Sequence, residues 1–261
     1  EDLLFFTSFG KVYELKAYEI PEGTRTSRGQ AIINLLRLEN GERITEIITL
    51  SDLSEDSQII LQTQEGRIKK TDAENFTSIQ KNGIIAIGLN EGDKLISVRQ
   101  LNEKKDIIVT TSQGMAIKFS SKDVRSMGRQ AQGVRAIRLN KDDKVVSMNI
   151  VEGETYLVVV TENGYGKKTS FNNFKNQNRG GKGLKCHKVT EKTGLVVDTL
   201  PADLEDDIMM VSLKGDMIRI SSRDISTTGR STVGVKLKNL ANEDDRIVSV
   251  TKYEESTEDE G

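Results

Sequence analysis

Short apolar runs separated by turn residues make up most of the hydrophobic pattern of this chain. One run at 107–111 (IIVTT) leads into a glycine turn, and a second at 115–119 (MAIKF) follows it directly. Segments this short, rich in Ile and Val and bounded by Gly, Asn or Asp, are typical of β-hairpins. The stretches 134–139 (VRAIRL) and 235–240 (VKLKNL) alternate apolar and polar residues, which predicts half-buried strands. No segment keeps the spacing of an amphipathic helix, so the pattern predicts an all-β protein.

This strand pattern repeats along the chain. An apolar run, then Thr or Ser, then a glycine recur at intervals of 56, 48, 50 and 51 residues. These first glycines are Gly10, Gly66, Gly114, Gly164 and Gly215. A second glycine follows 19, 17, 19, 19 and 19 residues later, at Gly29, Gly83, Gly133, Gly183 and Gly234. Such units, each with four strands, predict a propeller-like fold, with a stacked solenoid as the alternative.

The repeats define the expected domain organisation. We place them at about 1–55, 56–103, 104–152, 153–204 and 205–253, all within a single domain. The remaining segment, 254–261 (EESTEDEG), is acidic and has no apolar residue, so we expect a disordered tail there.

Composition excludes several classes of protein. No apolar run approaches the roughly 20 residues that cross a bilayer, and the first residues lack the pattern of a signal peptide. The single cysteine, Cys186, and the single histidine, His187, are too few for an internal disulfide and disfavour a zinc site or a Cys-His catalytic pair. We expect Cys186 to lie on a strand beside an exposed His187. The absence of Trp excludes a Trp-Asp repeat propeller. We therefore expect a cytoplasmic protein with no metal site and no membrane partner, and the composition disfavours an enzyme with familiar nucleophilic chemistry.

Charge is distributed unevenly, although the 38 basic and 40 acidic residues give a formal net charge of only −2. In every repeat, the segment from the second to the third predicted strand is basic. These segments, which carry 27 basic and 7 acidic residues together, are 11–37, 67–88, 118–138, 167–188 and 219–238. The rest of the chain carries 11 basic and 33 acidic residues. Because these loops and the acidic turns lie at opposite ends of the strands in a four-stranded blade, we expect a basic strip that suits the phosphates of a duplex.

Arginines and glycines in the basic loops indicate contact with phosphates. An Arg falls 15 residues after the first glycine in four of the five repeats, among small residues as in MGRQAQG (127–133). Glycines let the chain approach a phosphate closely and expose its N–H groups, and no element for reading base edges is visible. The alternative is that the glycines only form turns and the lysines only keep the protein soluble, and five loops in register favour phosphate contact over it. The expected DNA-binding residues are Arg25, Arg28, Lys69, Lys70, Lys81, Lys118, Lys122, Arg125, Arg129, Arg135, Arg138, Lys167, Lys168, Lys175, Arg179, Lys182, Lys185, Lys188, Arg219, Arg223, Arg230, Lys236 and Lys238.

These loops and the first repeat resemble a known family. The segments 3–36 (LLFFTSFGKVYELKAYEIPEGTRTSRGQAIINLL), 126–139 (SMGRQAQGVRAIRL) and 227–240 (TTGRSTVGVKLKNL) are very similar to the carboxy-terminal domain of the A subunit of bacterial DNA gyrase. The resemblance covers the chain up to the acidic tail. It implies a β-pinwheel, which is a propeller-like disc of six four-stranded blades that exchange strands, with DNA wrapped around a basic rim.

The family also has a seven-residue box, Gln-Arg-Arg-Gly-Gly-(Lys/Arg)-Gly. The segment Gln177-Asn178-Arg179-Gly180-Gly181-Lys182-Gly183 matches six of the seven positions, with Asn178 in place of the first Arg. In the family, the box belongs to the repeat that precedes the LLFFT strand, and this chain starts at that strand. The resemblance therefore implies that five of six repeats are present and that 177–183 is a degenerate second copy of the box.

By resemblance, this domain is a non-catalytic part of an ATP-dependent type II topoisomerase. It would wrap double-stranded DNA without reading its sequence, so that gyrase introduces negative supercoils. The implied protein partners are the remaining part of the gyrase A subunit, together with the gyrase B subunit in an A₂B₂ holoenzyme. ATP and Mg²⁺ would be used outside this domain, with no cofactor within it. The implied location is the bacterial cytoplasm at the nucleoid, and the isolated domain would be monomeric.

Other proteins with related folds remain as alternatives. The homologous domain of topoisomerase IV also binds DNA but without obligatory wrapping, and the close match over 3–36 favours gyrase. A protein-interaction propeller would use the basic rim to bind an acidic partner. A sugar-active propeller would need carboxylates around a central opening, whereas the acidic clusters of this chain lie in expected turns.

Overall fold

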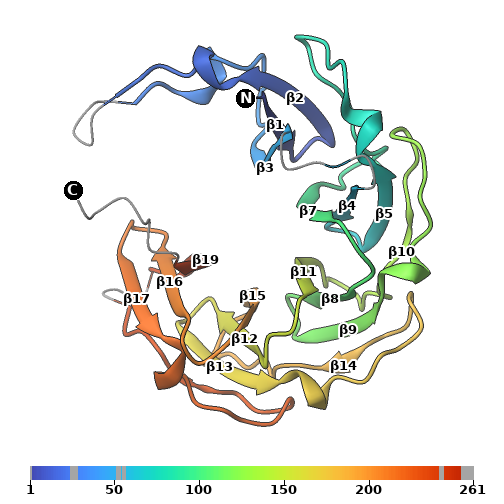
Figure 1. Ribbon diagram of the computed structural model, residues 1–261. Coiled ribbons are helices and arrows are strands. Elements are labelled where there is room, and N and C mark those ends of the chain that lie inside the picture. Colours follow the sequence, from blue (N-terminus) through green and yellow to red (C-terminus); the bar gives the residue numbers. More distant parts are fainter. Residues whose placement is uncertain (1, 24–28, 51–53, 55–56, 241–243, 254–261) are drawn as a thin grey trace. The chain divides into compact units, whose positions relative to one another are not determined.

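The protein consists of two compact units of β-sheet, seen in a computed structural model (Figure 1). One unit is formed by Glu1–Lys104 and Ser121–Arg135, and the other by Lys105–Ser120 and Ala136–Gly261. The predicted acidic tail at 254–261 and two predicted site residues, Arg25 and Arg28, lie outside the described part of the chain. The described residues are 2–23, 29–50, 54, 57–240 and 244–253.

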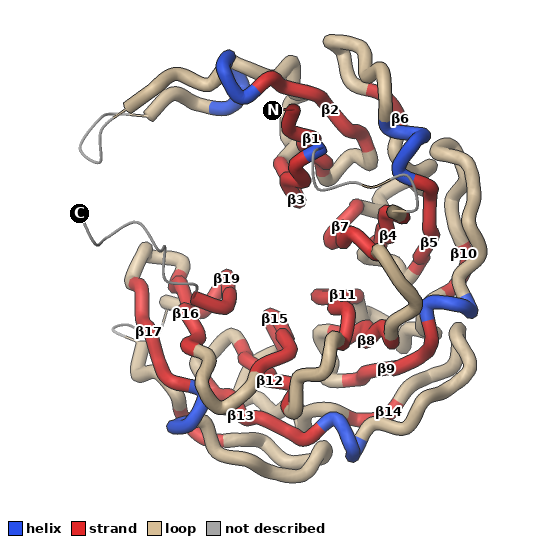
Figure 2. The backbone as a smooth tube through the Cα atoms, viewed as in Figure 1, coloured by secondary structure: helices blue, strands red, loops and turns tan. Residues whose placement is uncertain are grey.

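The first unit contains two four-stranded antiparallel sheets, with the strand orders β3-β1-β2-β6 and β10-β5-β4-β7 (Figure 2). The strands of one sheet are β1 (Asp2–Thr7), β2 (Lys11–Lys16), β3 (Ile44–Thr49) and β6 (Ile84–Ile85). Those of the other are β4 (Gln58–Thr63), β5 (Arg67–Asp72), β7 (Leu95–Leu101) and β10 (Val134–Arg135). Short 3₁₀ turns in the loops are η1 (Ala17–Glu19), η2 (Ile32–Asn34), η4 (Ala73–Phe76) and η5 (Ser121–Asp123).

The second unit contains three sheets, with the orders β11-β8-β9-β14, β15-β12-β13-β18 and β17-β16-β19. The first is built from β8 (Asp106–Thr111), β9 (Met115–Ser120), β11 (Val145–Val151) and β14 (Leu184–Lys185). The second is built from β12 (Tyr156–Thr161), β13 (Tyr165–Ser170), β15 (Val196–Ala202) and β18 (Val235–Lys236). The third has β16 (Asp207–Ser212), β17 (Met217–Ser221) and β19 (Ile247–Tyr253), and the 3₁₀ turns are η6 (Phe171–Asn173) and η7 (Ser222–Asp224).

The prediction of an all-β protein is confirmed. No α-helix occurs among the described residues, and Figure 2 shows only short helical turns between strands and long loops. No helical turn in the described part of the chain has the length or the hydrophobicity needed to cross a membrane. The apolar runs of the sequence form the central strands, such as β4 and β12, in which five consecutive residues are buried. Continuous burial replaces the usual alternation because both faces of these strands are covered.

Neighbouring repeats exchange strands. The two-residue strand β6 pairs with β2, although β6 follows the hairpin β4–β5 in the chain. In the same way β10 pairs with β5, β14 with β9 and β18 with β13. The strand exchange that the resemblance implied is therefore present. In the described residues, β17 is not paired with such a fourth strand.

The strands predicted at 134–139 and 235–240 are shorter than expected. Only Val134–Arg135 and Val235–Lys236 are strands, and each joins the sheet of the preceding repeat. The reason is visible at the equivalent β6, after which Ala86 and Ile87 leave the sheet edge and become buried to 0% and 1% exposure. Burial of these apolar side chains in the core stabilises the fold more than the hydrogen bonds of a longer edge strand would.

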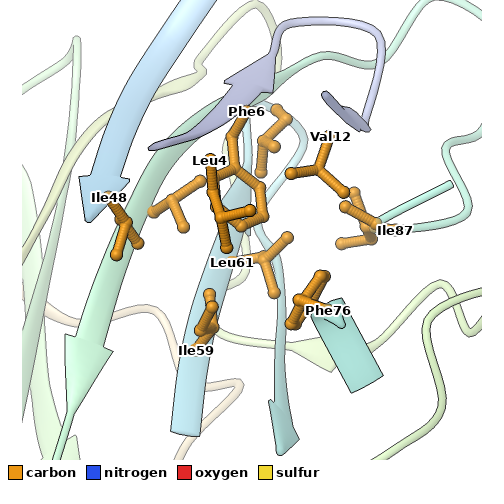
Figure 3. Close-up of a cluster of buried hydrophobic side chains, with 11 residues drawn as sticks. Leu4, Phe6, Val12, Ile48, Ile59, Leu61, Phe76 and Ile87 are labelled. Carbon is orange, nitrogen blue, oxygen red and sulfur yellow. The ribbon is translucent and has the colours of Figure 1, made fainter. Parts of the chain in front are cut away.

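The exchanged segment enters a core between the two sheets of the first unit (Figure 3). Leu4 and Phe6 of β1 belong to the same buried cluster as Ile59 of β4 and Ile87. The rings of Phe6 and Phe76 meet edge to face with centroids 5.5 Å apart. Each such side chain contributes about 1.5–3 kcal/mol when it leaves water. A single repeat therefore buries its apolar residues only against the next one.

Some acidic residues of the turns have a structural role. Asp143 accepts hydrogen bonds from the hydroxyl groups of Thr111 and Ser112 at 2.7 and 2.9 Å and from the N–H of Gln113 at 3.0 Å. Asp93 accepts from the N–H of Glu65 at 2.9 Å. These carboxylates satisfy the donors of the hairpin turns, which explains why acidic residues recur at these places.

Candidate nucleic-acid interface

Most of the predicted DNA-binding residues lie on the surface of their own unit. The residues with exposed side chains are Lys81, Lys122, Arg125, Arg135, Arg138, Lys175, Lys182, Lys185, Lys188, Arg219, Arg223 and Lys236. The half-buried residues are Lys70, Lys118, Arg129, Arg179, Arg230 and Lys238. A phosphate can approach the exposed side chains from solvent without a rearrangement of the fold.

Three of the predicted DNA-binding lysines are inside the protein instead. The exposed fractions of Lys69, Lys167 and Lys168 are 0%, 0% and 2%. A phosphate cannot reach these ammonium groups, so the prediction that they contact DNA is wrong. They belong to basic segments of the sequence, but the loop of the following repeat covers each of them.

Lys69 in β5 donates hydrogen bonds to two consecutive main-chain carbonyl groups. Its Nζ lies 3.0 Å from the carbonyl oxygen of Gly128 and 2.5 Å from that of Arg129. Burial, with a smaller contribution from the Arg129 guanidinium, lowers the pKa of Lys69 to about 7. The ammonium group therefore holds the loop that carries Arg129.

Lys167 in β13 makes the equivalent contacts two repeats further along the chain. Its Nζ lies 2.6 Å from the carbonyl oxygens of both Gly229 and Arg230 and 3.1 Å from the hydroxyl of Thr232. Burial lowers the pKa of Lys167 to about 8, opposed by Cys186 and assisted by the Arg230 guanidinium. Two lysines that are 98 positions apart therefore make the same contacts in two different units.

Three turns that each carry an arginine have a common attachment. We call the segments 126–133, 176–183 and 227–234 the arginine turns, after Arg129, Arg179 and Arg230. Each turn runs along the second strand of the preceding repeat. The equivalent hydrogen bonds run from the N–H of Met127 to the carbonyl of Lys70, from Gln177 to Lys118 and from Thr228 to Lys168, at 2.8, 2.8 and 2.9 Å.

The 176–183 turn, which contains the box-like motif, differs from the other two. The residue beneath it is the fully buried Ile117, which occupies the position of Lys69 and Lys167. A methyl group built on Gly181 would lie 3.6 Å from Cδ1 of Ile117. Gly180 has a φ of +82°, in the left-handed region that favours glycine. Gly180 therefore has a local structural reason besides any role in binding, whereas the space around Gly181 would accept a methyl group at ordinary contact distance.

Several predicted cations are paired with carboxylates. Arg219 donates to Asp207 at 2.6 Å and lies over the ring of Tyr253, 3.9 Å from its centroid. Arg223 forms an ion pair with Glu205. Because exposed ion pairs contribute little free energy, these residues can exchange a carboxylate for a phosphate at low cost.

The sequence reasoning missed a lysine-lined cavity in the first unit. Its volume is about 430 Å³, and its lining includes Lys70, Lys104 and Lys122 beside Glu103. Lys104 was not predicted because it lies in the linker before β8, outside the basic segments. Burial lowers the pKa of Lys70, opposed by Asp72 and assisted by Lys104. Clustering of this kind depends on the fold and leaves no signal in the sequence.

A second group that the sequence reasoning missed surrounds Tyr165 in the second unit. The ammonium groups of Lys192 and Lys236 lie 5.4 and 4.9 Å from the centroid of the Tyr165 ring. Only Lys236 was predicted, because Lys192 lies in a turn that otherwise carries Glu191. Cation–π contacts hold both lysine heads at one place on the surface.

His187 is buried rather than exposed, contrary to the expectation. Its exposed fraction is 1%, and neither ring nitrogen has a hydrogen-bond partner in the described residues. Burial, together with the nearby Lys167, lowers the pKa of His187 to about 4. Burial also raises the pKa of the Cys186 thiol to about 12. Within the described residues, no group of three or more His, Cys, Asp or Glu is arranged to hold a metal ion.

Comparison with known proteins gives the family. A family model described as the DNA gyrase C-terminal domain, a beta-propeller, matches residues 1–51, 57–102, 105–152, 155–203 and 206–252. The chain belongs to this family. The resemblance drawn from the residues is therefore confirmed, and so is the propeller-like class of the fold.

Curated members of the family are similar over nearly the whole chain. The DNA gyrase A subunit of Halalkalibacterium halodurans is 53% identical over 252 residues, which cover 97% of this chain and 30% of that protein. The same protein of Streptococcus pyogenes serotype M1 is 54% identical, and that of Clostridium acetobutylicum is 43% identical, each over 96% of this chain and 30% of the relative. The chain spans about 30% of the length of these relatives.

Solved structures agree with the family. A structure described as the DNA gyrase A C-terminal domain matches with a TM-score of 0.84 and 31% identity, over 97% of this chain and 82% of that one. The C-terminal domain of DNA topoisomerase IV matches with a TM-score of 0.90 and 23% identity, over 97% and 79% of the two chains. The second likeness concerns the fold alone.

Proposed function

We propose that this chain is the non-catalytic DNA-binding part of the A subunit of a DNA gyrase, and that it holds duplex DNA through contacts to phosphates. Membership of the family and the identity with the gyrase A subunit of three bacteria support this function. The observation that carries it is the set of arginine turns, each fixed to the preceding sheet, with exposed basic residues in the turn or shortly after it. Those residues are Arg135 and Arg138, Lys182 and Lys185, and Lys236.

The chemistry of these turns suits a binding mode that does not read sequence. Each Lys or Arg that neutralises a phosphate releases condensed counterions, and this release supplies most of the affinity. Reading base edges requires an element that enters a groove, such as a helix or a β-ribbon. The described residues contain only short 3₁₀ turns and edge strands of two residues at these places. Specificity for a base sequence is therefore not expected.

We further propose that the bound DNA is bent and wrapped. Bending a duplex smoothly through 40–90° costs on the order of 1–6 kcal/mol. Contacts distributed over several turns offset this cost without any base contact, as in other wrapping proteins. In the intact enzyme, a wrap of fixed handedness would present a nearby segment of the same DNA for strand passage. Each passage would then introduce negative supercoils.

The rest of the enzyme would supply the chemistry. Cleavage of DNA and hydrolysis of ATP with Mg²⁺ would take place in the other parts of the A subunit together with the B subunit, within an A₂B₂ assembly in the bacterial cytoplasm. Because this chain spans about 30% of the length of its curated relatives, these partners and this activity are inferred for the whole protein.

Salt dependence tests DNA binding through phosphates. We expect the affinity of the intact protein for a random-sequence duplex to fall by about 10³–10⁵ between 50 and 200 mM salt, as for 6–10 phosphate contacts. Duplexes of different sequence should give equal affinities. An affinity that changes less than threefold over this range would contradict the proposal.

A topology measurement tests wrapping separately. Circular DNA is relaxed by an unrelated topoisomerase in the presence of the protein, and the linking number is measured after the protein is removed. A change of constant sign that grows with protein concentration is expected for a chiral wrap. No change, together with retained DNA binding, would match the binding without wrapping that was considered above for the topoisomerase IV domain.

A further inference from the structure

Two of the three arginine turns are each hydrogen-bonded to a buried lysine ammonium group. Lys69 donates to the carbonyl groups of Gly128 and Arg129, and Lys167 donates to those of Gly229 and Arg230. In both cases the acceptors are the arginine itself and the glycine before it. The contact therefore fixes the peptide from which the arginine side chain extends.

A buried ammonium group is costly unless it is fully hydrogen-bonded. Lys69 and Lys167 have exposed fractions of 0%, and their acceptors are main-chain carbonyls with, for Lys167, the Thr232 hydroxyl. Carbonyl oxygens do not cancel the charge as a carboxylate would. An apolar residue would fill the same space at a lower cost, as Ile117 does in the intermediate repeat. A lysine at this position therefore needs a reason other than packing.

The arginines above these lysines are placed at the surface of the turn. The Arg230 guanidinium donates to the carbonyl of the exposed Lys185 at 3.3 Å, which sets it beside the basic residues of the preceding turn. Among the described residues, the Arg129 guanidinium makes no hydrogen bond or ion pair, which leaves its five donors for a ligand. Both side chains are half-buried, so their direction is limited by the peptide to which they are attached.

We propose that Lys69 and Lys167 are positioning residues for DNA binding, which hold Arg129 and Arg230 in place through the turn carbonyls without contacting DNA themselves. This inference rests on the proposed function, because it assumes that the two arginines bind phosphates. It replaces the direct phosphate contact that the sequence predicted for these lysines. It also explains why a charged group is kept in the interior beneath two of the three arginine turns.

The test is a double-mutant cycle in the intact protein, measured as affinity for a random-sequence duplex. Arg230→Ala removes one phosphate contact and should weaken binding about fivefold to tenfold near 0.1 M salt, with a salt slope smaller by about one. Lys167→Met has nearly the same shape as lysine but cannot donate. We expect it to weaken binding by nearly as much as Arg230→Ala and to reduce the slope equally, although the lysine does not touch DNA.

The double variant decides between the roles. If Lys167 acts through Arg230, then Lys167→Met with Arg230→Ala binds no more weakly than Arg230→Ala alone. Losses that multiply would mean that the lysine contributes independently, and an unchanged affinity and slope for Lys167→Met would mean that it serves stability only. Either result would overturn the proposal. The pair Lys69→Met and Arg129→Ala repeats the cycle in the other unit.

Two further variants keep the experiment interpretable. Ile117→Met is the matched control, since it changes the equivalent buried position without removing a donor, and it should leave affinity and slope unchanged. If Lys167→Met does not fold, as judged by near-UV circular dichroism, Lys167→Gln retains two donors and should show a smaller loss that again disappears in the Arg230→Ala background. If the wild type shows no salt-dependent binding of DNA, the proposed function is wrong. If the wild type binds as expected but the losses of affinity in the two single variants multiply in the double variant, only the positioning role is wrong.

Discussion

The second unit holds two arginine turns by different means. The 227–234 turn is hydrogen-bonded to the Lys167 ammonium group, whereas the apolar and fully buried Ile117 occupies the equivalent position beneath the 176–183 turn. Where the first turn has Ser231, the second has Gly180 with a φ of +82°. Ser231 is not among the residues with positive φ. A turn that lacks the ammonium group therefore has a different backbone conformation, which only glycine adopts without strain.

This difference indicates that the turn and the residue beneath it form one structural element. A hydrogen bond from a charged donor contributes about 1.5–3 kcal/mol and directs the carbonyl groups toward the lysine. Without that donor, no lysine hydrogen bond directs the carbonyl groups inward, and the backbone can adopt the left-handed conformation that Gly180 permits. The box-like motif at 177–183 is then explained partly by what lies below it and not only by what it binds.

The largest expected effect is on stability, at the glycine that ends each of the two turns and packs against the main chain of the preceding repeat. Gly183 and Gly234 have φ values of +74° and +71°, and an added methyl group would lie 2.5 Å from the Ala116 carbonyl oxygen and 2.4 Å from that of Gly166. We expect Gly183→Ala and Gly234→Ala each to lower the free energy of unfolding by about 3 kcal/mol or more, because the clash is with main chain. Urea unfolding measures this effect.

A matched control for these two variants is Gly128→Ala. Gly128 has open space around its Cα and no positive φ, so this substitution should change stability by less than about 0.5 kcal/mol. A similar small loss for Gly183→Ala or Gly234→Ala would contradict this packing of the two glycines.

The intermediate effect separates the two turns. Gly180→Ala forces a methyl group into a left-handed conformation, which costs about 1–2 kcal/mol. Ser231→Ala, at the equivalent position of the lysine-held turn, should cost almost nothing because Ser231 is exposed and lacks a positive φ. Thermal unfolding of both variants checks the difference. Equal losses would show that the two turns share one conformation in solution.

The smallest expected effect is a pH dependence that only the lysine-held turns have. Because the pKa of Lys167 is lowered from 10.5 to about 8 in the folded state, the unfolded chain binds more protons between these values, and stability rises with pH in this window. The titratable groups that face Lys167 are Arg230, Cys186 and His187, of which only Arg230 is charged between pH 7.5 and pH 9. We expect the gain in unfolding free energy from pH 7.5 to pH 9 to be smaller in Lys167→Met than in the wild type.

Ile117→Met provides the comparison for this pH dependence. The variant keeps Lys69, Lys167 and Lys168, so its gain between the two pH values should equal that of the wild type. Denaturant unfolding at both pH values gives each difference, in which other titrating groups cancel. An equal gain in Lys167→Met and the wild type would show that Lys167 keeps an ordinary pKa in the fold.

Much of the fold could be predicted from the residues alone. Gly114 marks a hairpin turn, and its equivalents Gly10, Gly66, Gly164 and Gly215 recur in the other repeats because each hairpin needs a positive φ at this place. The apolar runs predicted the central strands correctly, since a strand that is buried on both faces reads as a continuous apolar run. The local pattern could not show that Val134–Arg135 would pair with β5, because pairing between repeats depends on which sheet edges meet.

The residues alone could assign the cations to loops and strands but could not show which side chains are exposed. Lys69 and Lys70 are neighbours in one basic segment, yet one is fully buried and the other lines a cavity with Lys104. Alternation along β5 points the two side chains in opposite directions, and only the covering loop decides which direction is inside.

The sequence by itself determined the repeat, the all-β class, the family and the separation of basic loops from acidic turns, because each of these depends on residue type and spacing. The tertiary structure decided which cations face solvent and which face the carbonyl groups of the next repeat. The physical reason is that a lysine ammonium group is stable either in water or among enough hydrogen-bond acceptors. Which of the two surrounds Lys167 depends on the 227–234 turn, about 60 residues further along the chain.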